Sequence, residues 1–79
     1  DIEEIDESNI DIYPNPASDV VYVNLTEPFN VTIYNYQGQL VKNVYVDNAQ
    51  VNVSGLSDGI YFMLIRTENN VAVKKIIVE

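Results

Sequence analysis

The stretch "GIYFMLIRT", Gly59 to Thr67, decides the fold because almost every residue in it is apolar. Successive side chains of an extended chain point to opposite faces, and both faces of this stretch are apolar. Such a run predicts a central β-strand covered on both sides. Gly55 and Gly59 bracket a turn just before it, so the chain can bend sharply into this strand.

Short runs of β-branched and aromatic residues flank this strand and are separated by turn residues. Several of them alternate between apolar and polar side chains, as a strand with one buried face does. The residues that alternation predicts to face a core are Val21, Val23, Leu25, Phe29, Val31, Ile33, Val51 and Val53. The predicted strands are Asp11–Tyr13, Val20–Leu25, Phe29–Tyr34, Leu40–Asp47, Gln50–Val53, Ile60–Thr67 and Val71–Val78. Without any helical periodicity, this pattern predicts an all-β fold: a small seven-stranded immunoglobulin-like antiparallel β-sandwich.

Residue types predict two further turns. In "NYQGQ", Gly38 stands where a tight hairpin needs a positive φ angle. In "TENNV", Asn69 and Asn70 are the non-glycine residues that best tolerate the left-handed region. Both stretches therefore predict hairpins between neighbouring strands.

In the last run, "VAVKKIIVE", apolar and polar side chains do not alternate regularly. A regular strand would place Lys75 on the same face as Val73 and Ile77. Either the lysines reach out from an edge strand, or a bulge at Lys74 and Lys75 resets the register. We favour the bulge.

The opening stretch "IYPNPASD", Ile12 to Asp19, contains two prolines directly before a strand. Pro14 and Pro16 offer no backbone donor and favour extended conformations at Tyr13 and Asn15. The stretch therefore predicts a stiff crossover that ends a first strand at Tyr13. Ser18 or Asp19 would close the bend through a side-chain bond to the backbone.

Charge divides the 79 residues into a leader and a domain. The formal net charge is −8, and half of the acidic residues lie within the first eleven positions. This balance argues against a nucleic-acid partner and against anionic membrane surfaces. Residues 1–9 read as an acidic linker, with a short helix as the alternative, and residues 10–79 as the folded domain. No apolar run approaches the ~18 residues of a transmembrane helix.

Catalytic chemistry is hard to build from these residues. The chain has no histidine and no cysteine, so the commonest bases, nucleophiles and soft metal ligands are missing. We therefore expect no enzyme and no cofactor. A calcium-type site from turn oxygens is conceivable, although turn formation explains the same residues better. Its ligands would be Asp11, Asn15, Asp19, Asp47 and Asp58.

The order of four motifs resembles a known family. "YPNPASD" with a following strand, then "VTIYNYQGQLV", "LSDGIYFMLIRT" and "VAVKKIIVE", is similar to the C-terminal sorting domains (type A) of the type IX secretion system of Bacteroidota. The resemblance covers about Ile10 to Glu79. The positions that match the family's motifs are Pro14, Asn15, Pro16, Gly38, Gly59, Tyr61, Lys74, Lys75, Ile76, Ile77 and Val78.

The resemblance implies a β-sandwich that acts as a secretion signal for an attached cargo protein. Such domains pass through the periplasm and are recognised by an outer-membrane translocon. A sortase-like peptidase commonly removes them, and the cargo is released or anchored at the cell surface. Ile76 to Val78 would be the end segment of the family, and cleavage would fall in the acidic leader, residues 1–9. An exposed terminal strand would offer its edge to a receptor, with Lys74 and Lys75 steering toward acidic groups.

Two other functions fit the same sequence. The domain could be an immunoglobulin-like module that binds a carbohydrate or a protein through exposed tyrosines such as Tyr22 and Tyr34. It could instead be a stabilising spacer. An edge-strand homodimer is a further possibility under any of these functions.

Overall fold

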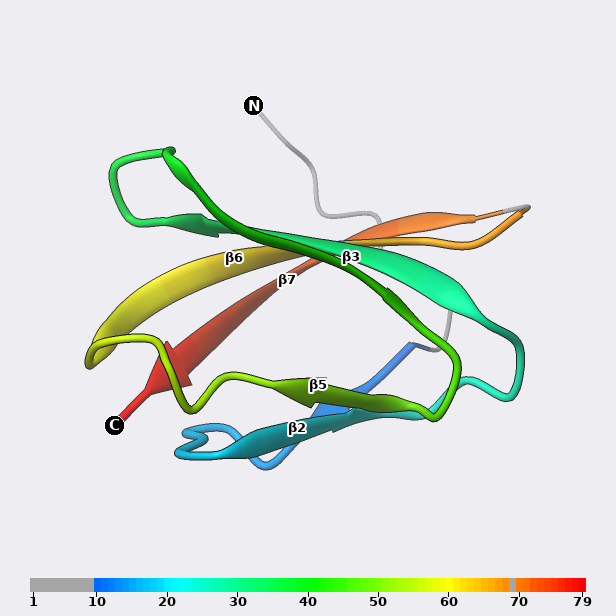
Figure 1. Cartoon of the computed structure of the whole chain (residues 1–79), viewed down its shortest axis with the longest axis horizontal. Coiled ribbons are helices and arrows are strands. Elements are labelled where there is room, and N and C mark those ends of the chain that lie inside the picture. The colour runs from blue at the N-terminus through cyan, green and yellow to red at the C-terminus, as the bar shows by residue number, and fades with distance from the viewer. Residues whose placement is uncertain (1–9, 69) are drawn as a thin grey trace.

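The computed structural model describes residues 10–68 and 70–79, which form seven β-strands (Figure 1). The predictions for the leader, residues 1–9, and for Asn69 lie outside the described residues. The strands are β1 (Ile12–Tyr13), β2 (Val20–Val23), β3 (Phe29–Asn35), β4 (Leu40–Val46), β5 (Gln50–Asn52), β6 (Gly59–Arg66) and β7 (Val71–Val78). Each strand end lies within two residues of its predicted position.

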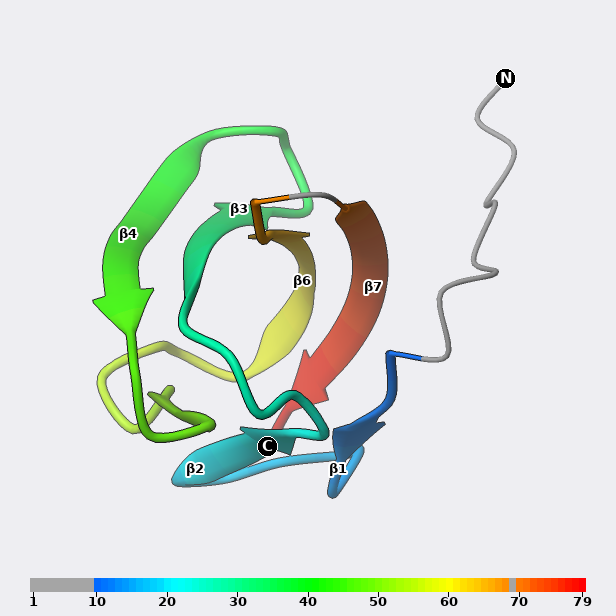
Figure 2. The same cartoon turned by 90° about the vertical axis from the view of Figure 1, so that its right-hand side faces the viewer.

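The strands form two sheets that pack face to face. One sheet has the order β1-β2-β5, and the other has the order β4-β3-β6-β7, with antiparallel pairing between all neighbours. Figure 2 shows β1 and β7 on the same side of the sandwich, so the two strands lie at neighbouring edges of the two sheets. This is the arrangement of immunoglobulin-like domains, and the predicted fold class is confirmed.

The core lies between the two sheets and consists of aliphatic side chains with a few aromatic ones. Its fully buried members include Val21 and Val51 from one sheet and Ile33, Met63 and Ile65 from the other. Each such side chain contributes about 1.5–3 kcal/mol by leaving water. All predicted core residues are buried except Leu25, which is half-buried and packs against the core from the loop after β2.

The central strand β6 has one buried face rather than two. Tyr61, Met63 and Ile65 face the core, whereas Phe62 and Leu64 on the other face are half-exposed. The predicted cover on both sides is therefore wrong, since no described element packs over the second face. An antiparallel sheet tolerates this, because only one of its faces needs to be dry.

The predicted bulge at Lys74 and Lys75 is also wrong. β7 pairs with β6 in one continuous register from Val71 to Val78. Ala72, Ile76 and Val78 are buried on the core side, while Val73 and Ile77 lie on the outer face with Lys75. The sequence was misleading because two apolar residues point outward here. Among the described residues, the pairing shifts register between Ile33 and Tyr34 instead, where β3 pairs with β4.

Candidate sorting-signal site

The proline corner is held against the end of β7 by one side chain. The Asn15 amide nitrogen donates a hydrogen bond to the carbonyl oxygen of Lys75 at 3.2 Å, and its amide oxygen accepts one from the N–H of Ile77 at 3.0 Å. These two bonds are those that one residue of a parallel strand would make. Asn15 thus extends the sheet past β7 with a side chain, at a position where Pro14 and Pro16 leave few backbone donors. The peptide bonds that precede both prolines are cis.

The pairing continues at Ala17 with backbone groups. The N–H of Ala17 donates to the carbonyl oxygen of Ile77 at 2.8 Å, and the N–H of Glu79 donates to the carbonyl oxygen of Ala17 at 2.9 Å. Ala17 forms a parallel bridge with Val78 and is only 2% exposed. We call Asn15 to Ala17 with Lys75 to Glu79 the terminal clamp. It joins positions about 60 residues apart, which makes both motif segments parts of one folded site.

The clamp changes the prediction that the terminal strand is open to a receptor. The outward backbone groups of Ile77 and Glu79 already have partners in the corner. Because outward-pointing groups alternate along a strand, the described residues leave the edge of β7 without a strand partner only around Val71 and Val73. Strand addition to the last residues would first require Asn15 and Ala17 to leave.

The two lysines occupy opposite faces of β7. Lys75 is exposed on the outer face, opposite Phe62 of β6. Lys74 is half-buried on the core-facing side, opposite the fully buried Met63. A single steering patch made by both side chains is therefore not what the fold presents. Ile76 and Val78 belong to the core, whereas Ile77 lies half-exposed on the outer face.

Tyr61 ties the start of β6 to the preceding turn. Its hydroxyl donates a 2.7 Å hydrogen bond to the carbonyl oxygen of Ser57, and the ring is buried. This is the tyrosine corner known from immunoglobulin-like sandwiches. Gly59 pairs with Val78 and Tyr61 with Ile76, so the "G-x-Y" motif lies directly beside the end of the chain on the neighbouring strand.

Gly38 serves a separate turn. It has a φ of 87° in the hairpin between β3 and β4, and its N–H donates to the carbonyl oxygen of Asn35. The side-chain oxygen of Asn35 accepts bonds from the N–H groups of Gln37 and Gln39, which fixes the loop. The predicted positive φ is confirmed. The hairpin lies two strands away from β7 in the sheet order, so Gly38 is not part of the clamp.

The fold thus brings together most of the motif residues. Pro14 to Pro16 meet Lys75 and Ile77, while Gly59 and Tyr61 pair with Val78 and Ile76. Sequence reasoning missed Ala17, Ser57 and Asn35 as partners of these motifs. Ser57 and Asn35 carry a recognisable signal, since each stands in a turn a few residues from Tyr61 or Gly38. Nothing local marks Ala17, whose partners lie at the far end of the chain.

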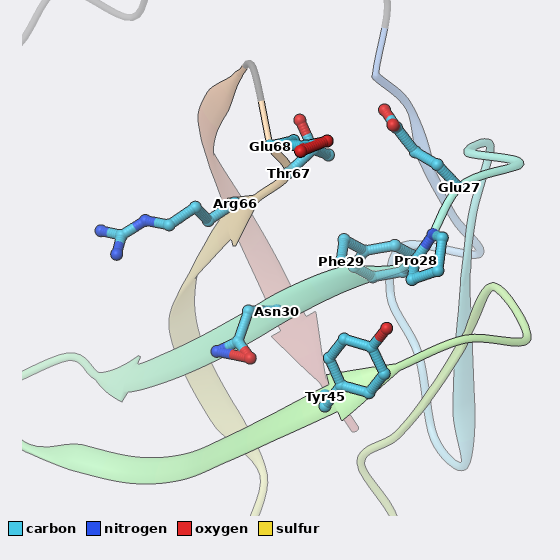
Figure 3. A pocket seen from close by; sticks show the side chains of 8 residues that line it. All are labelled: Glu27, Pro28, Phe29, Asn30, Tyr45, Arg66, Thr67 and Glu68. Carbon is cyan, nitrogen blue, oxygen red and sulfur yellow. The ribbon is translucent and has the colours of Figure 1, made fainter.

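Ligand chemistry is sparse in the described part of the chain. Residues 10–68 and 70–79 contain no group of three acidic residues placed to hold a metal ion, and no helix that is long and apolar enough to cross a bilayer. A hollow of about 390 Å³ opens at one end of the β4-β3-β6-β7 sheet (Figure 3). Pro28, Asn30, Tyr45, Arg66 and Glu68 are among the residues that line it. The Arg66 side chain points away from Glu27 and Glu68 in that view.

Comparison with known proteins agrees with the motif pattern. Residues 11–79 match the family model described as "Secretion system C-terminal sorting domain". The chain is also 30% identical, over 69 residues, to the protein named "Beta-agarase D" of Zobellia galactanivorans. That similarity covers 87% of this chain and 14% of the agarase, so the chain spans a small part of its relative's length. The chain belongs to the C-terminal sorting domain family of the type IX secretion system.

Proposed function

We propose that this domain is the secretion signal that directs an attached cargo protein across the outer membrane through the type IX machinery. Family membership supports this proposal, and the terminal clamp is the structural observation that carries it. The clamp joins the first and last motifs of the family in one folded site, so the signal is a three-dimensional unit rather than a linear tag. The destination of a secreted cargo is the cell surface or the medium, and the domain would pass through the periplasm on the way.

The cargo would be attached in front of residues 1–9, with residues 10–79 as the folded signal. A sortase-like cysteine peptidase of the system would cut within that junction. The cargo would then be released or joined to the cell surface. The signal itself would perform no catalysis and need no cofactor, in keeping with the absence of histidine and cysteine from the sequence.

One experiment tests the secretion-signal role and the cleavage step separately. A reporter with a periplasmic export signal is produced in a type IX-competent host, with and without residues 1–79 at its C-terminus. We expect only the fused reporter to reach the outside, and its mass there to lack residues 10–79. An external reporter of full mass would refute the cleavage step but not the role of the domain as a secretion signal. A fused reporter retained in the periplasm would refute that role itself.

A carbohydrate- or protein-binding module is the second candidate, because several tyrosines are exposed. Tyr13 and Tyr22 are 53% and 40% exposed and stack on each other with centroids 5.7 Å apart. They are register partners in β1 and β2, and cross-strand aromatic pairs of this kind stabilise a sheet. A Tyr22→Ala variant that is exported normally but loses binding to a cell-surface glycan would favour this second function.

A further inference from the structure

The outer face of the β4-β3-β6-β7 sheet is largely apolar over β6 and β7, although no described residue covers it. We call it the outer sheet face. The register places on it Leu40, Asn43 and Tyr45 of β4, Asn30, Thr32 and Tyr34 of β3, Ile60, Phe62, Leu64 and Arg66 of β6, and Val71, Val73, Lys75 and Ile77 of β7. Tyr45, Val71 and Val73 are 65%, 55% and 46% exposed. Its apolar side chains are neighbours on β6 and β7, where Leu64 pairs with Val73 and Ile60 with Ile77. An exposed apolar surface of this kind is typical of an interaction site.

The charges on this face are opposite in sign to those of the whole chain. Arg66 and Lys75 are its charged residues, and neither forms an ion pair with another described residue. No strand of the described chain carries an acidic residue. The described acids all lie in loops or at the chain end, at Asp11, Asp19, Glu27, Asp47, Asp58, Glu68 and Glu79. A chain of net charge −8 therefore presents one face that is apolar and cationic.

The spacing of the two cations suits an extended partner. Lys75 is opposite Phe62, which is four residues from Arg66 on β6. Four residues span about 13 Å along a strand and the next strand lies about 5 Å away, so the two Cα atoms are about 14 Å apart. Leu64 and Val73 lie between them as a register pair. An extended segment with carboxylates at positions i and i+4 has nearly this spacing, and its residue i+2 would meet the apolar centre.

The position of the acids favours a protein over a lipid surface. Glu27 and Glu68 border the hollow beside Arg66 (Figure 3). Glu79 follows Val78 at the other end of the sheet. A continuous anionic bilayer would approach these carboxylates as well as the cations and would be repelled by them. A second copy of the same face would bring like charges together. A segment with two discrete carboxylates meets the cations alone.

We propose that the outer sheet face is the docking surface for an acidic extended segment of a partner protein, in which an apolar side chain lies between two carboxylates, each two residues away. The inference deepens the proposed function, on which it rests for the identity of the partner as a component of the export machinery. The docking itself depends only on the sheet. Carboxylates of the partner pair with Arg66 and Lys75, and its apolar side chain covers Leu64 and Val73.

A peptide titration tests the docking without any secretion. The probe is a capped peptide of sequence Gly-Thr-Glu-Thr-Val-Thr-Glu-Thr-Gly, and the control peptide has lysine in place of both glutamates. We expect the probe to shift backbone amide resonances of residues 30–34, 62–66 and 71–75 in the isotope-labelled chain, and salt of about 0.5 M to weaken it strongly. Equal binding of the control peptide, shifts confined to loops, or no shifts at all would overturn the proposal.

Two neighbouring lysines supply matched variants. Lys75→Glu places a negative charge on the outer sheet face, whereas Lys74→Glu makes the same change on the opposite side of β7. We expect Lys75→Glu to lower the affinity for the probe peptide about tenfold, because it replaces an attraction to the peptide's carboxylates with a repulsion. Lys42→Glu is a second control, because Lys42 pairs with the buried Ile33 and lies on the core-facing side of β4. Urea unfolding confirms that the variants compared are folded. Equal weakening by Lys75→Glu and a folded control would count against the outer face.

An export arm links the surface to the function. The reporter fusion carries Arg66→Glu and Lys75→Glu together, beside the unaltered fusion and the Lys42→Glu fusion. We expect export to fall only for the double variant. If the unaltered fusion is not exported, the proposed function fails and the peptide titration decides the docking surface alone. If all three fusions are exported equally, the proposed function stands and docking of the export partner on this face is excluded.

Discussion

Replacing Asn15 by alanine removes both side-chain bonds of the terminal clamp and leaves the strands themselves unchanged. The two bonds, 3.2 and 3.0 Å long, connect the proline corner to the backbone of Lys75 and Ile77. Each such bond contributes about 0.5–1.5 kcal/mol net, and water can replace part of it because Asn15 is exposed. We therefore expect a loss of about 1–2 kcal/mol in the free energy of unfolding. For a domain of this size, that corresponds to a fall of about 5–15 °C in melting temperature.

Urea unfolding followed by circular dichroism measures this loss, and two variants calibrate it. Asn48→Ala removes an exposed asparagine whose side chain bonds only to the nearby N–H of Gln50, so its cost should be a few tenths of a kcal/mol. Asn15→Asp keeps the acceptor for Ile77 but puts a carboxylate against the carbonyl oxygen of Lys75. It should therefore cost at least as much as one lost bond. An Asn15→Ala variant as stable as Asn48→Ala would refute the clamp.

Three further substitutions test the rest of the fold, each by urea unfolding. Tyr61→Phe loses the hydrogen bond to the carbonyl oxygen of Ser57 and should lower the free energy of unfolding by about 1 kcal/mol. An unchanged urea midpoint would show that this bond does not stabilise the domain. Gly38→Ala forces a side chain into a φ of 87° and should cost about 1–2 kcal/mol, whereas Gly55→Ala should cost less, because Gly55 has no left-handed φ and the new methyl group meets open space at both positions. Equal costs for the two glycines would contradict the turn geometry. Ile65→Ala empties a fully buried site and should cost about 2–5 kcal/mol, a large share of what a domain of this size has, and a cost below that of Tyr61→Phe would contradict the assigned core.

The strands were predictable because most of their side chains alternate as a half-buried sheet requires. Val21 and Val23 on β2, and Phe29, Val31 and Ile33 on β3, follow that rule without exception. Local patterns of this kind need no knowledge of distant partners. The fold class follows from their number and from the short turns between them.

The faces of β6 and β7 were not predictable in the same way. Phe62, Leu64, Val73 and Ile77 are apolar and their hydrophobicity predicts burial, yet they lie on the outer sheet face. Hydrophobicity identifies a buried residue only when nothing else in the function needs an exposed apolar surface. The same misassignment produced the wrong bulge at Lys74 and Lys75.

The sequence motifs indicate candidate site residues but not the contacts between them. Resemblance to the family identified the proline corner and the end segment separately. The contact between Asn15 and Lys75 spans almost the whole chain, and no local pattern encodes which backbone groups a side-chain amide will reach. The turn at Ala49, with a φ of 63°, likewise carries no glycine or asparagine at that position to announce it.

Residues 1–79 should suffice to send an attached passenger protein through the type IX system. The most direct measurement is the fraction of a fused periplasmic reporter found outside the cell, in a type IX-competent strain and in a strain that lacks its outer-membrane translocon. The expected result is a reporter outside the first strain and inside the periplasm of the second. The same periplasmic retention in both strains, with the fused domain intact and folded, would show that these residues do not act as a type IX secretion signal.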